Sequence, residues 1–306
     1  MIDRREVLAA SATALAASLV TPSTAAFAQA TTAPGTTRGF LERPGCKVYY
    51  EVTGSGPPIM FAHGIGSNHL TWWQQVPYFS QRHTCVTFSH RGYPPSSAIG
   101  VPDPKEFADD LAALIDHLHL PDVRLVAQSM GGWTVIEYIL THPQHKVRAL
   151  VLASTCGTIN RAAVPLNDPQ RLSEYNRKAV EQRADMLRRG ISPPAGERMA
   201  QEQPALHFLY RMIANASAAF DREELRKRTV AMSTRRPDVL RDFSMPTLFI
   251  TGEEDTATFP PFIAEALAPM MPNARVEQIA KAGHSTYFER PDVFNRLVDN
   301  FLSKTG

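Results

Sequence analysis

Short apolar runs alternate with amphipathic segments from residue 47 onward, and this alternation limits the possible folds more than any other feature of the sequence. The runs Ile59–Ala62, Val123–Gln128 and Val147–Ala153 are almost continuously apolar, as strands buried on both faces are. Phe107–Leu120 between them carries apolar residues at helical spacing. Strands and helices in this alternation predict an α/β protein with a doubly wound, mostly parallel sheet.

The alternation stops near residue 155 and resumes near residue 247. The segment between is charged and rich in methionine and aromatic residues, with helical patterns at about 169–189, 195–215, 222–232 and 237–243. We therefore expect one domain over 39–306 that carries a helical cap inserted at about 156–243. The expected role of the cap is to cover the site.

The first 28 residues have the order of a bacterial export signal. Arg4-Arg5 precedes the uncharged run Val7–Val20, and Ala26-Phe27-Ala28 offers the small residues of a cleavage site. The paired arginines resemble a twin-arginine signal. The apolar run, about 14 residues, is short of the ~20 that span a bilayer. An ordinary alanine-rich helix is the alternative.

We therefore expect an exported protein, periplasmic or secreted, with a linker over 29–38 and no stable membrane insertion once the signal is removed. The three cysteines, Cys46, Cys85 and Cys156, lack CxxC spacing, and their odd number favours buried free thiols. No metal or cofactor is expected. The net charge of +2 without a basic block predicts no nucleic-acid partner.

The strongest chemical signal is the segment Ala127-Gln128-Ser129-Met130-Gly131-Gly132, which joins a predicted strand to a predicted helix. A serine on such a sharp turn is presented as a nucleophile, and the turn needs small neighbours, which Ala127 and Gly131 supply. The alternative is a serine that merely caps a glycine-rich helix start. We predict Ser129 as the nucleophile.

A second segment, His63-Gly64-Ile65-Gly66, follows the first buried strand. Acyl transfer needs two backbone N–H donors aimed at the developing oxyanion. We predict that Ile65 and Met130 supply them, because one donor follows the nucleophile and the other comes from this loop. His63 is predicted to be structural.

A serine hydroxyl needs a base, and the base needs a carboxylate that orients it. Asp255 follows a predicted strand, and His284 lies in the loop after the last one. With Ser129 they give the chain order serine, aspartate, histidine that is expected when the nucleophile lies on a strand-to-helix turn of such a sheet. Glu253 and Glu254 are weaker candidates for the acid.

Residues 39–302 resemble the α/β-hydrolase family, and within it the group of 3-oxoadipate enol-lactonases, esterases and cofactor-free haloperoxidases. The matching stretches are His63–Gly66, Ser129–Gly132, Val147–Leu152, Gly283-His284 and His284–Leu302. The resemblance implies the fold and the triad, but says little of the substrate. Ser89 stands where the family often has aspartate, and Tyr93-Pro94-Pro95-Ser96 departs from the family pattern nearby.

The expected reaction is hydrolysis of a carboxylic ester or lactone through an acyl-enzyme. The alternatives are C–C bond or amide hydrolysis, cofactor-free perhydrolysis or haloperoxidation on the same triad, and, remotely, a binding protein without catalysis. The substrate is expected to be a small molecule with a hydrophobic part, held in a pocket whose candidate lining residues are Trp73, Trp133, Phe208 and Met212.

Overall fold

The computed structural model describes residues 35–120, 122–217 and 220–305. The predicted export signal lies outside these residues, and so does most of the predicted linker. The described residues contain an eight-stranded sheet in the order β1-β2-β4-β3-β5-β6-β7-β8. Its strands are β1 Thr36–Arg43, β2 Cys46–Thr53, β3 Pro58–Ala62, β4 Thr84–Phe88, β5 Asp122–Gln128, β6 Lys146–Ala153, β7 Thr247–Gly252 and β8 Ala274–Ile279.

From β4 to β8 every neighbouring pair of strands is parallel, whereas β1 and β2 pair antiparallel. The predicted α/β fold with a mostly parallel sheet is therefore confirmed. The edge strand β1 begins at Thr36, before the predicted domain boundary at residue 39, and its side chains are mostly exposed. An exposed strand has no continuous apolar run, so the sequence pattern did not reveal it.

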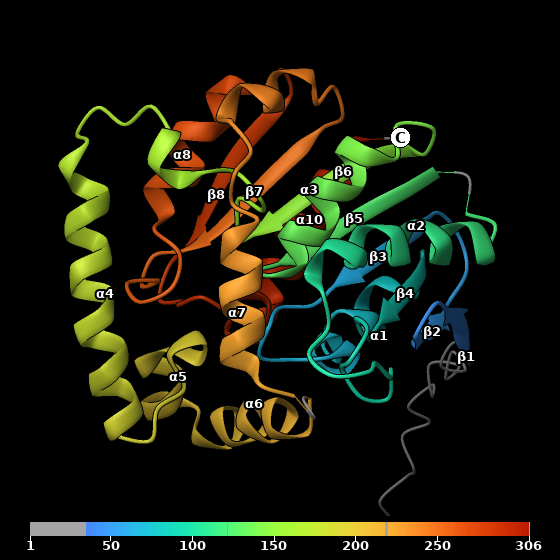
Figure 1. The fold of residues 1–306 in the computed structure, drawn as a ribbon, viewed down its shortest axis with the longest axis horizontal. Coiled ribbons are helices and arrows are strands. Elements are labelled where there is room, and N and C mark those ends of the chain that lie inside the picture. The colour runs from blue at the N-terminus through green and yellow to red at the C-terminus, as the bar shows by residue number, and fades with distance from the viewer. Residues whose placement is uncertain (1–34, 121, 218–219, 306) are drawn as a thin grey trace, which may run out of the picture. The chain divides into compact units, whose positions relative to one another are not determined.

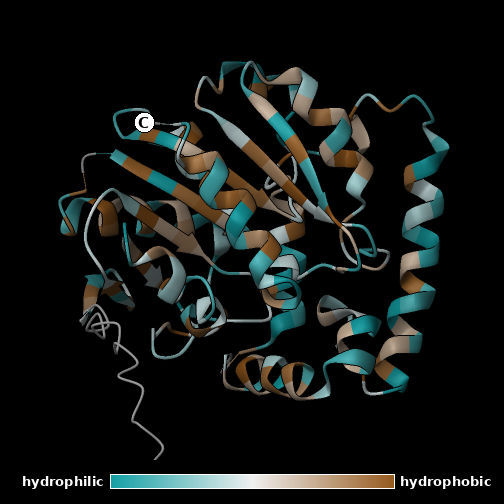
Figure 2. Cartoon of the chain, turned by 180° about the vertical axis from the view of Figure 1, so that it is seen from behind, coloured by the Kyte–Doolittle hydropathy of each residue, from teal (hydrophilic) through white to brown (hydrophobic). Residues whose placement is uncertain are grey.

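Helices cover both faces of the sheet, as the apolar strands require (Figure 1). The helices α2 Phe107–His117, α3 Gly131–Thr141 and α8 Pro261–Leu267 pack on one face. The opposite face is covered by the short helix α1 Val76–Phe79 and by α10 Pro291–Leu302. Figure 2 shows brown, hydrophobic stretches along the strands of the sheet.

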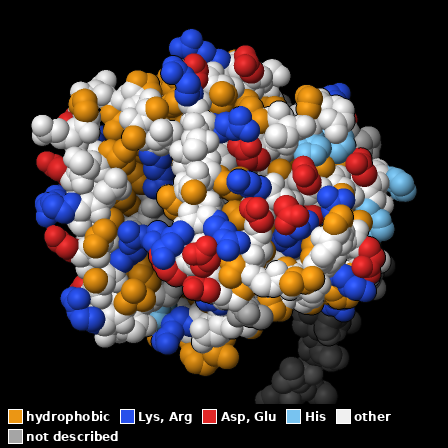
Figure 3. Space-filling view, in the orientation of Figure 1, with side chains coloured by type: hydrophobic (Ala, Val, Ile, Leu, Met, Phe, Trp, Pro, Cys, Tyr) orange, Lys and Arg blue, Asp and Glu red, His pale blue; other side chains and the backbone are white. Residues whose placement is uncertain are grey.

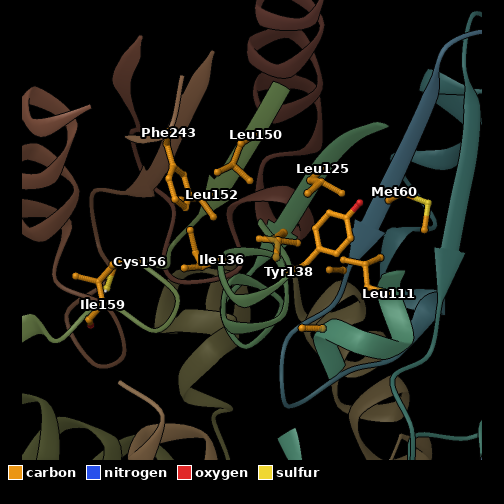
Figure 4. Packing of buried hydrophobic residues seen from close by; sticks show 14 of the residues in the cluster. Met60, Leu111, Leu125, Ile136, Tyr138, Leu150, Leu152, Cys156, Ile159 and Phe243 are labelled. Carbon is orange, nitrogen blue, oxygen red and sulfur yellow. Dashed lines mark hydrogen bonds between the residues drawn. The ribbon is translucent and has the colours of Figure 1, made fainter. Parts of the chain in front are cut away.

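The larger core cluster lies between the sheet and the helices α2, α3 and α8. Ile136 and Tyr138 of α3 lie beside Leu152 and Leu125 of the central strands (Figure 4). Their burial fixes the start of α3, and with it the turn that carries Ser129, against the strands on either side.

The described residues between β6 and β7 form the helices α4 Gln170–Arg188, α5 Gly196–Glu202, α6 Pro204–Ala216 and α7 Arg222–Ala231. Figure 1 shows α4 standing along one side of the sheet, with α5 and α6 beyond its end. The helix predicted over 195–215 is two helices, because Pro204 cannot continue a helix and Gln203 before it has non-helical dihedral angles. The last predicted helix is a 3₁₀ helix, Pro237–Asp242.

The cysteines, possible metal ligands, possible membrane spans and surface charges can now be compared with the sequence-based expectations. Cys46, Cys85 and Cys156 are free and buried, as predicted. Within the described ranges, no three His, Cys, Asp or Glu side chains are grouped so as to hold a metal, and no helix is long and apolar enough to cross a membrane. Acidic and basic side chains are interspersed on the face shown in Figure 3.

Candidate active site

Ser129 occupies a strained turn between β5 and α3. Its φ angle is +49°, a left-handed conformation that is uncommon for any residue but glycine. Its backbone N–H donates to the carbonyl oxygen of Ala153 at 3.1 Å, and its carbonyl oxygen accepts from Gly132 N–H at 2.8 Å. Such a strained strand-to-helix turn is the local geometry of a serine nucleophile on an α/β sheet.

Two glycines let neighbouring backbone approach this turn. A Cβ added to Gly131 would meet the backbone of Ala62 in β3, with its carbonyl carbon only 2.7 Å away. A Cβ added to Gly64 would meet the Gln128 side chain and would lie 3.2 Å from Cβ of Ser129. The loop after β3 therefore lies directly against the serine, and only glycine permits so close an approach.

Asp255 and His284 are joined by a buried hydrogen bond. His284 Nδ1 lies 2.6 Å from Asp255 Oδ2, and both residues are 3% exposed. Asp255 Oδ1 accepts the backbone N–H groups of Thr258 and Phe259 at 3.1 and 3.0 Å, which fixes the carboxylate. Because the carboxylate can only accept, Nδ1 of His284 is the donor in neutral imidazole, and Nε2 carries the free lone pair.

Nε2 of His284 is buried and has no hydrogen-bond partner among the described residues. A lone pair in this position can accept a proton from a hydroxyl brought against it. The arrangement of a base whose other nitrogen is held by a carboxylate is the one that activates a serine.

The parallel sheet brings the three predicted residues to one edge. Ser129 follows β5, Asp255 follows β7 and His284 follows β8, and the carboxyl ends of these parallel strands lie along the same edge. Gln128, which precedes Ser129, contacts the loop that carries His284, because its Nε2 lies 3.5 Å from the carbonyl oxygen of His284. The loop of His284 therefore lies beside the turn of Ser129.

The backbone N–H groups of Ile65 and Met130 are the two that were predicted to bind an oxyanion. Neither donates a hydrogen bond within the part of the chain that the structure describes. Tyr93 links the two residues, since its buried hydroxyl donates to the carbonyl oxygen of Ile65 at 3.1 Å and lies 3.5 Å from Sδ of Met130. The segment that departs from the family pattern therefore contacts both residues that were predicted as oxyanion donors.

Glu289 is a site residue that the sequence analysis missed. Its carboxyl is 2% exposed and accepts the N–H groups of Gly283 at 2.8 Å and Ser285 at 3.1 Å, the two neighbours of His284. Burial raises the pKa of Glu289 to about 8, against the effect of these two N–H groups. Its place five residues after the histidine gave no signal without a structure.

Cap residues bind the loops of the acid and the base. Tyr175 of α4 donates its hydroxyl to the carbonyl oxygen of Asp255 at 3.0 Å, and Ser285 Oγ donates to Tyr210 Oη of α6 at 3.0 Å. Arg198 of α5 binds both carboxylate oxygens of Glu254, with Nε 3.0 and 2.9 Å from them. Glu254, a weaker candidate for the acid, is thus engaged in an ion pair.

A cavity of about 380 Å³ lies between the helices α4 and α5 and the segments that follow β7 and β8. Met186 and Arg198 line it from the cap, and Thr256, Gly283 and Glu289 line it from the loops of the acid and the base. Ser129 is not among its lining residues, so this cavity adjoins the acid and base side of the site.

The four candidate pocket residues are placed differently from one another. Trp133 is buried in α3 and donates its Nε1 hydrogen to Ser233 Oγ at 3.2 Å. Trp73, Phe208 and Met212 are each more than two-fifths exposed. The structure does not bury these three against the triad, and their role in binding stays a prediction.

Comparison with known proteins identifies the family. The sequence pattern described as the alpha/beta hydrolase fold matches residues 57–291, and the chain belongs to this family. Among solved structures, Est816, described as an N-acyl homoserine lactone degrading enzyme, is similar over 86% of this chain and 100% of its own, with a TM-score of 0.68 and 24% identity. That likeness establishes the fold.

Three curated relatives cover more than four-fifths of the chain. A protein of Azorhizobium caulinodans provisionally named as a carbamate hydrolase is 26% identical over 84% of this chain and 95% of its own. The 3-oxoadipate enol-lactonase 2 of Acinetobacter baylyi is 26% identical over 81% of this chain and 89% of its own. A non-heme haloperoxidase of Rhodococcus erythropolis is 26% identical over 84% of this chain and 96% of its own. The relatives thus share a fold while their names describe different reactions.

Proposed function

We propose that the protein hydrolyses carboxylic esters or lactones through an acyl-enzyme formed on Ser129. Ser129 Oγ attacks the carbonyl carbon while His284 Nε2 takes the hydroxyl proton. The oxyanion binds the N–H groups of Ile65 and Met130. His284 then gives its proton to the leaving alcohol, which in a lactone stays attached to the acyl group.

Water completes the cycle by the same route. His284 Nε2 takes a proton from a water molecule, which attacks the acyl-enzyme and releases the acid, and the proton returns to Ser129 Oγ. Asp255 holds the imidazole in the required tautomer throughout and stabilises its charged form.

The observation that carries this proposal is the 2.6 Å contact between His284 Nδ1 and Asp255 Oδ2. It leaves Nε2 buried and without a hydrogen-bond partner among the described residues, on the sheet edge where Ser129 sits in its strained turn. A binding protein has no need of an oriented base with a free lone pair beside a strained serine, so the arrangement favours catalysis over binding alone.

The names of the relatives keep two other reactions in view. The carbamate and haloperoxidase names agree with amide-type hydrolysis and with perhydrolysis, and both could use the same serine. We favour esters and lactones because the enol-lactonase is a relative of similar identity and because the proposed groups supply all the proton transfers of ester cleavage.

The test is hydrolysis of p-nitrophenyl butyrate by the protein and by two serine variants. Ser129→Ala should lower kcat by several orders of magnitude, as loss of a nucleophile does. Ser55→Ala, the same change at an exposed loop serine, should leave kcat unchanged. Equal activity of Ser129→Ala and the parent would overturn the proposal. Amides, carbamates and peroxide with bromide complete the panel.

We also propose that the chain is exported with removal of residues 1–28. The paired arginines, apolar run and small residues at 26–28 support this proposal. The mature N-terminus should lie near Gln29 when the protein is recovered from the periplasm or medium. Recovery there with Met1 intact, or retention in the cytoplasm, would contradict it.

A further inference from the structure

Three buried polar side chains beside the oxyanion loop take no part in the proposed proton transfers. His63, His90 and Thr134 are 0%, 2% and 1% exposed, so water does not satisfy their polar atoms. They form a continuous hydrogen-bonded row: Thr134 Oγ1 lies 2.9 Å from His90 Nε2, and His90 Nδ1 lies 2.9 Å from His63 Nε2. The row ends on Gly64, whose carbonyl oxygen is 2.9 Å from His63 Nδ1.

The direction of every hydrogen bond in the row follows from its two ends. A carbonyl oxygen only accepts, so His63 Nδ1 carries the hydrogen. Burial lowers the pKa of His63 to about 3 and lowers that of His90 as well, so both rings are neutral at pH 7. His63 Nε2 is therefore an acceptor, and it also receives the backbone N–H of His90 at 3.0 Å.

The tautomer of His90, the second ring of the row, follows in the same way. The opposite tautomer of His90 would place two nitrogen lone pairs 2.9 Å apart, so His90 Nδ1 carries the hydrogen and shares His63 Nε2 with the backbone N–H. His90 Nε2 then accepts the hydroxyl hydrogen of Thr134. The first donor of the row is thus the Thr134 hydroxyl, and the last hydrogen bond runs from His63 Nδ1 to the carbonyl oxygen of Gly64. Removing that hydroxyl leaves His90 Nε2 buried without a hydrogen-bond partner, so the ring keeps only one of the two contacts that hold it, the one to His63.

The carbonyl of Gly64 and the N–H of Ile65 belong to one peptide group, so the row of hydrogen bonds affects the orientation of the Ile65 N–H. In a planar trans peptide the C=O and the following N–H point in opposite directions. The carbonyl oxygen of Gly64 is held by His63 Nδ1 at 2.9 Å and by the N–H and hydroxyl of Ser67 at 3.2 Å each. Holding that oxygen fixes the direction of the Ile65 N–H, a proposed oxyanion donor.

The row also connects the two halves of the oxyanion hole. Thr134 lies in α3, one helical turn beyond Met130, whose N–H is the other proposed donor. The position of the Ile65 N–H is thereby coupled to α3, the helix that follows Ser129. A donor that is displaced from the position of the developing oxyanion stabilises the transition state less, and the rate falls.

We propose that His90 and Thr134 are positioning residues that orient the Ile65 N–H through His63 and the Gly64 peptide. This inference rests on the proposed function, because it assigns the orientation of a donor in that reaction. Neither residue touches the reacting atoms. Their effect is therefore expected in kcat, with little change in KM.

The first test compares two substitutions at Thr134 in the full chain. Thr134→Val keeps the shape and removes the hydroxyl, and should lower kcat for p-nitrophenyl butyrate about tenfold to a hundredfold, less than the loss of a whole oxyanion donor. Thr134→Ser keeps the hydroxyl and should restore kcat to within a few-fold of the parent. A valine variant with parental kcat, or a serine variant as impaired as valine, would overturn the proposal.

A second readout does not require activity. Long-range ¹H–¹⁵N spectra of the histidine rings should show His63 and His90 of the parent protein as neutral Nδ1–H tautomers at pH 7. Signals are assigned with His90→Gln, since the chain has 10 histidines. An Nε2–H tautomer at His63 would overturn the proposal even if a Thr134 variant failed to fold.

The two readouts separate this inference from the proposed function. If Ser129→Ala keeps parental activity, the proposed function fails whatever the tautomers are. If Ser129 is essential but Thr134→Val is unimpaired, the function stands and the positioning role fails.

Discussion

Asp255 is held on both of its carboxylate oxygens, which makes its role testable by a conservative change. One oxygen binds His284 and the other binds the N–H groups of Thr258 and Phe259. Asp255→Asn keeps the size of the side chain but removes the charge, and it no longer imposes the tautomer that leaves Nε2 free. We expect kcat to fall by about 10³- to 10⁴-fold with a small change in KM, measured on p-nitrophenyl butyrate.

The neighbouring carboxylate provides the matched control. Glu253 accepts the backbone N–H of Lys281 at 3.2 Å and was a weaker candidate for the acid. Glu253→Gln should retain kcat within a few-fold. A larger loss in Glu253→Gln than in Asp255→Asn would assign the acid to Glu253 and contradict its assignment to Asp255.

Glu289 makes stability depend on pH near neutrality. Its pKa is raised to about 8 in the folded chain, chiefly by burial, from 4.5 in the unfolded one. Between these values the folded state binds more protons than the unfolded state, so this group's contribution is full at low pH and is lost as pH rises through about 8. We expect the free energy of unfolding to fall from pH 7 to pH 8.5, measured by urea denaturation.

The control for this prediction is Glu289→Gln, which cannot ionise. Its unfolding free energy should change less between pH 7 and pH 8.5 than that of the parent protein. Buried neutral histidines such as His63 have lowered pKa values, so they destabilise the fold below about pH 6.5 and do not contribute in this window. Equal pH dependence in parent and variant would remove Glu289 as its source.

The residues found from the sequence and those missed differ in a physical way. The segments around Ser129, Asp255 and His284 are local patterns of a turn after a strand, and a local pattern is visible in one sequence. Glu289 and His90 act through contacts with backbone and side chains that are brought close only by folding. A single histidine or glutamate has no spacing that announces such a contact.

Each of three cap helices, α4, α5 and α6, has a side chain bound to the loops of the acid or the base. The Tyr175 hydroxyl of α4 binds the carbonyl oxygen of Asp255 at 3.0 Å, and we expect Tyr175→Phe to weaken this attachment. One lost hydrogen bond of this kind costs about 1 kcal/mol of unfolding free energy, measurable by urea denaturation. kcat should fall several-fold, because the Asp255 loop loses a restraint.

Tyr78→Phe is the control for the cap prediction. Tyr78 lies on α1 and donates its hydroxyl to Asp299 of α10 at 3.3 Å, on the opposite face of the sheet. This change should affect stability slightly and leave kcat unchanged. If both tyrosine variants lower kcat equally, the cap contact has no special role in holding Asp255.

The elements themselves show where sequence patterns are sufficient. Strands buried on both faces, such as β5 and β6, have continuous apolar runs and were predicted nearly to the residue. The exposed edge strand β1 has no such run, and the break at Pro204 falls inside an otherwise uniform helical pattern. Burial on both faces gives a strand an apolar run that can be recognised in the sequence, whereas an exposed edge strand forms because a neighbouring strand pairs with it.

At the scale of the whole molecule, the parallel sheet accounts for the assembly of the site. Ser129, Asp255 and His284 are separated along the chain by the cap and by the three strands β6, β7 and β8, yet each follows a strand whose carboxyl end lies on the same edge. Such an edge is where α/β proteins place their ligands. The fold could be predicted from the order of strands and helices, but the contacts between the cap and the catalytic loops could not.

The most direct test of the central claim is covalent labelling of the protein with a fluorophosphonate at pH 7, followed by peptide mass spectrometry. An activated serine attacks phosphorus and displaces fluoride, so one label should appear on Ser129. It should be lost in Ser129→Ala and strongly slowed in His284→Gln, with Ser55→Ala labelled as the parent is. A label on another residue, or equal labelling of Ser129→Ala, would contradict the assignment of Ser129 as the nucleophile.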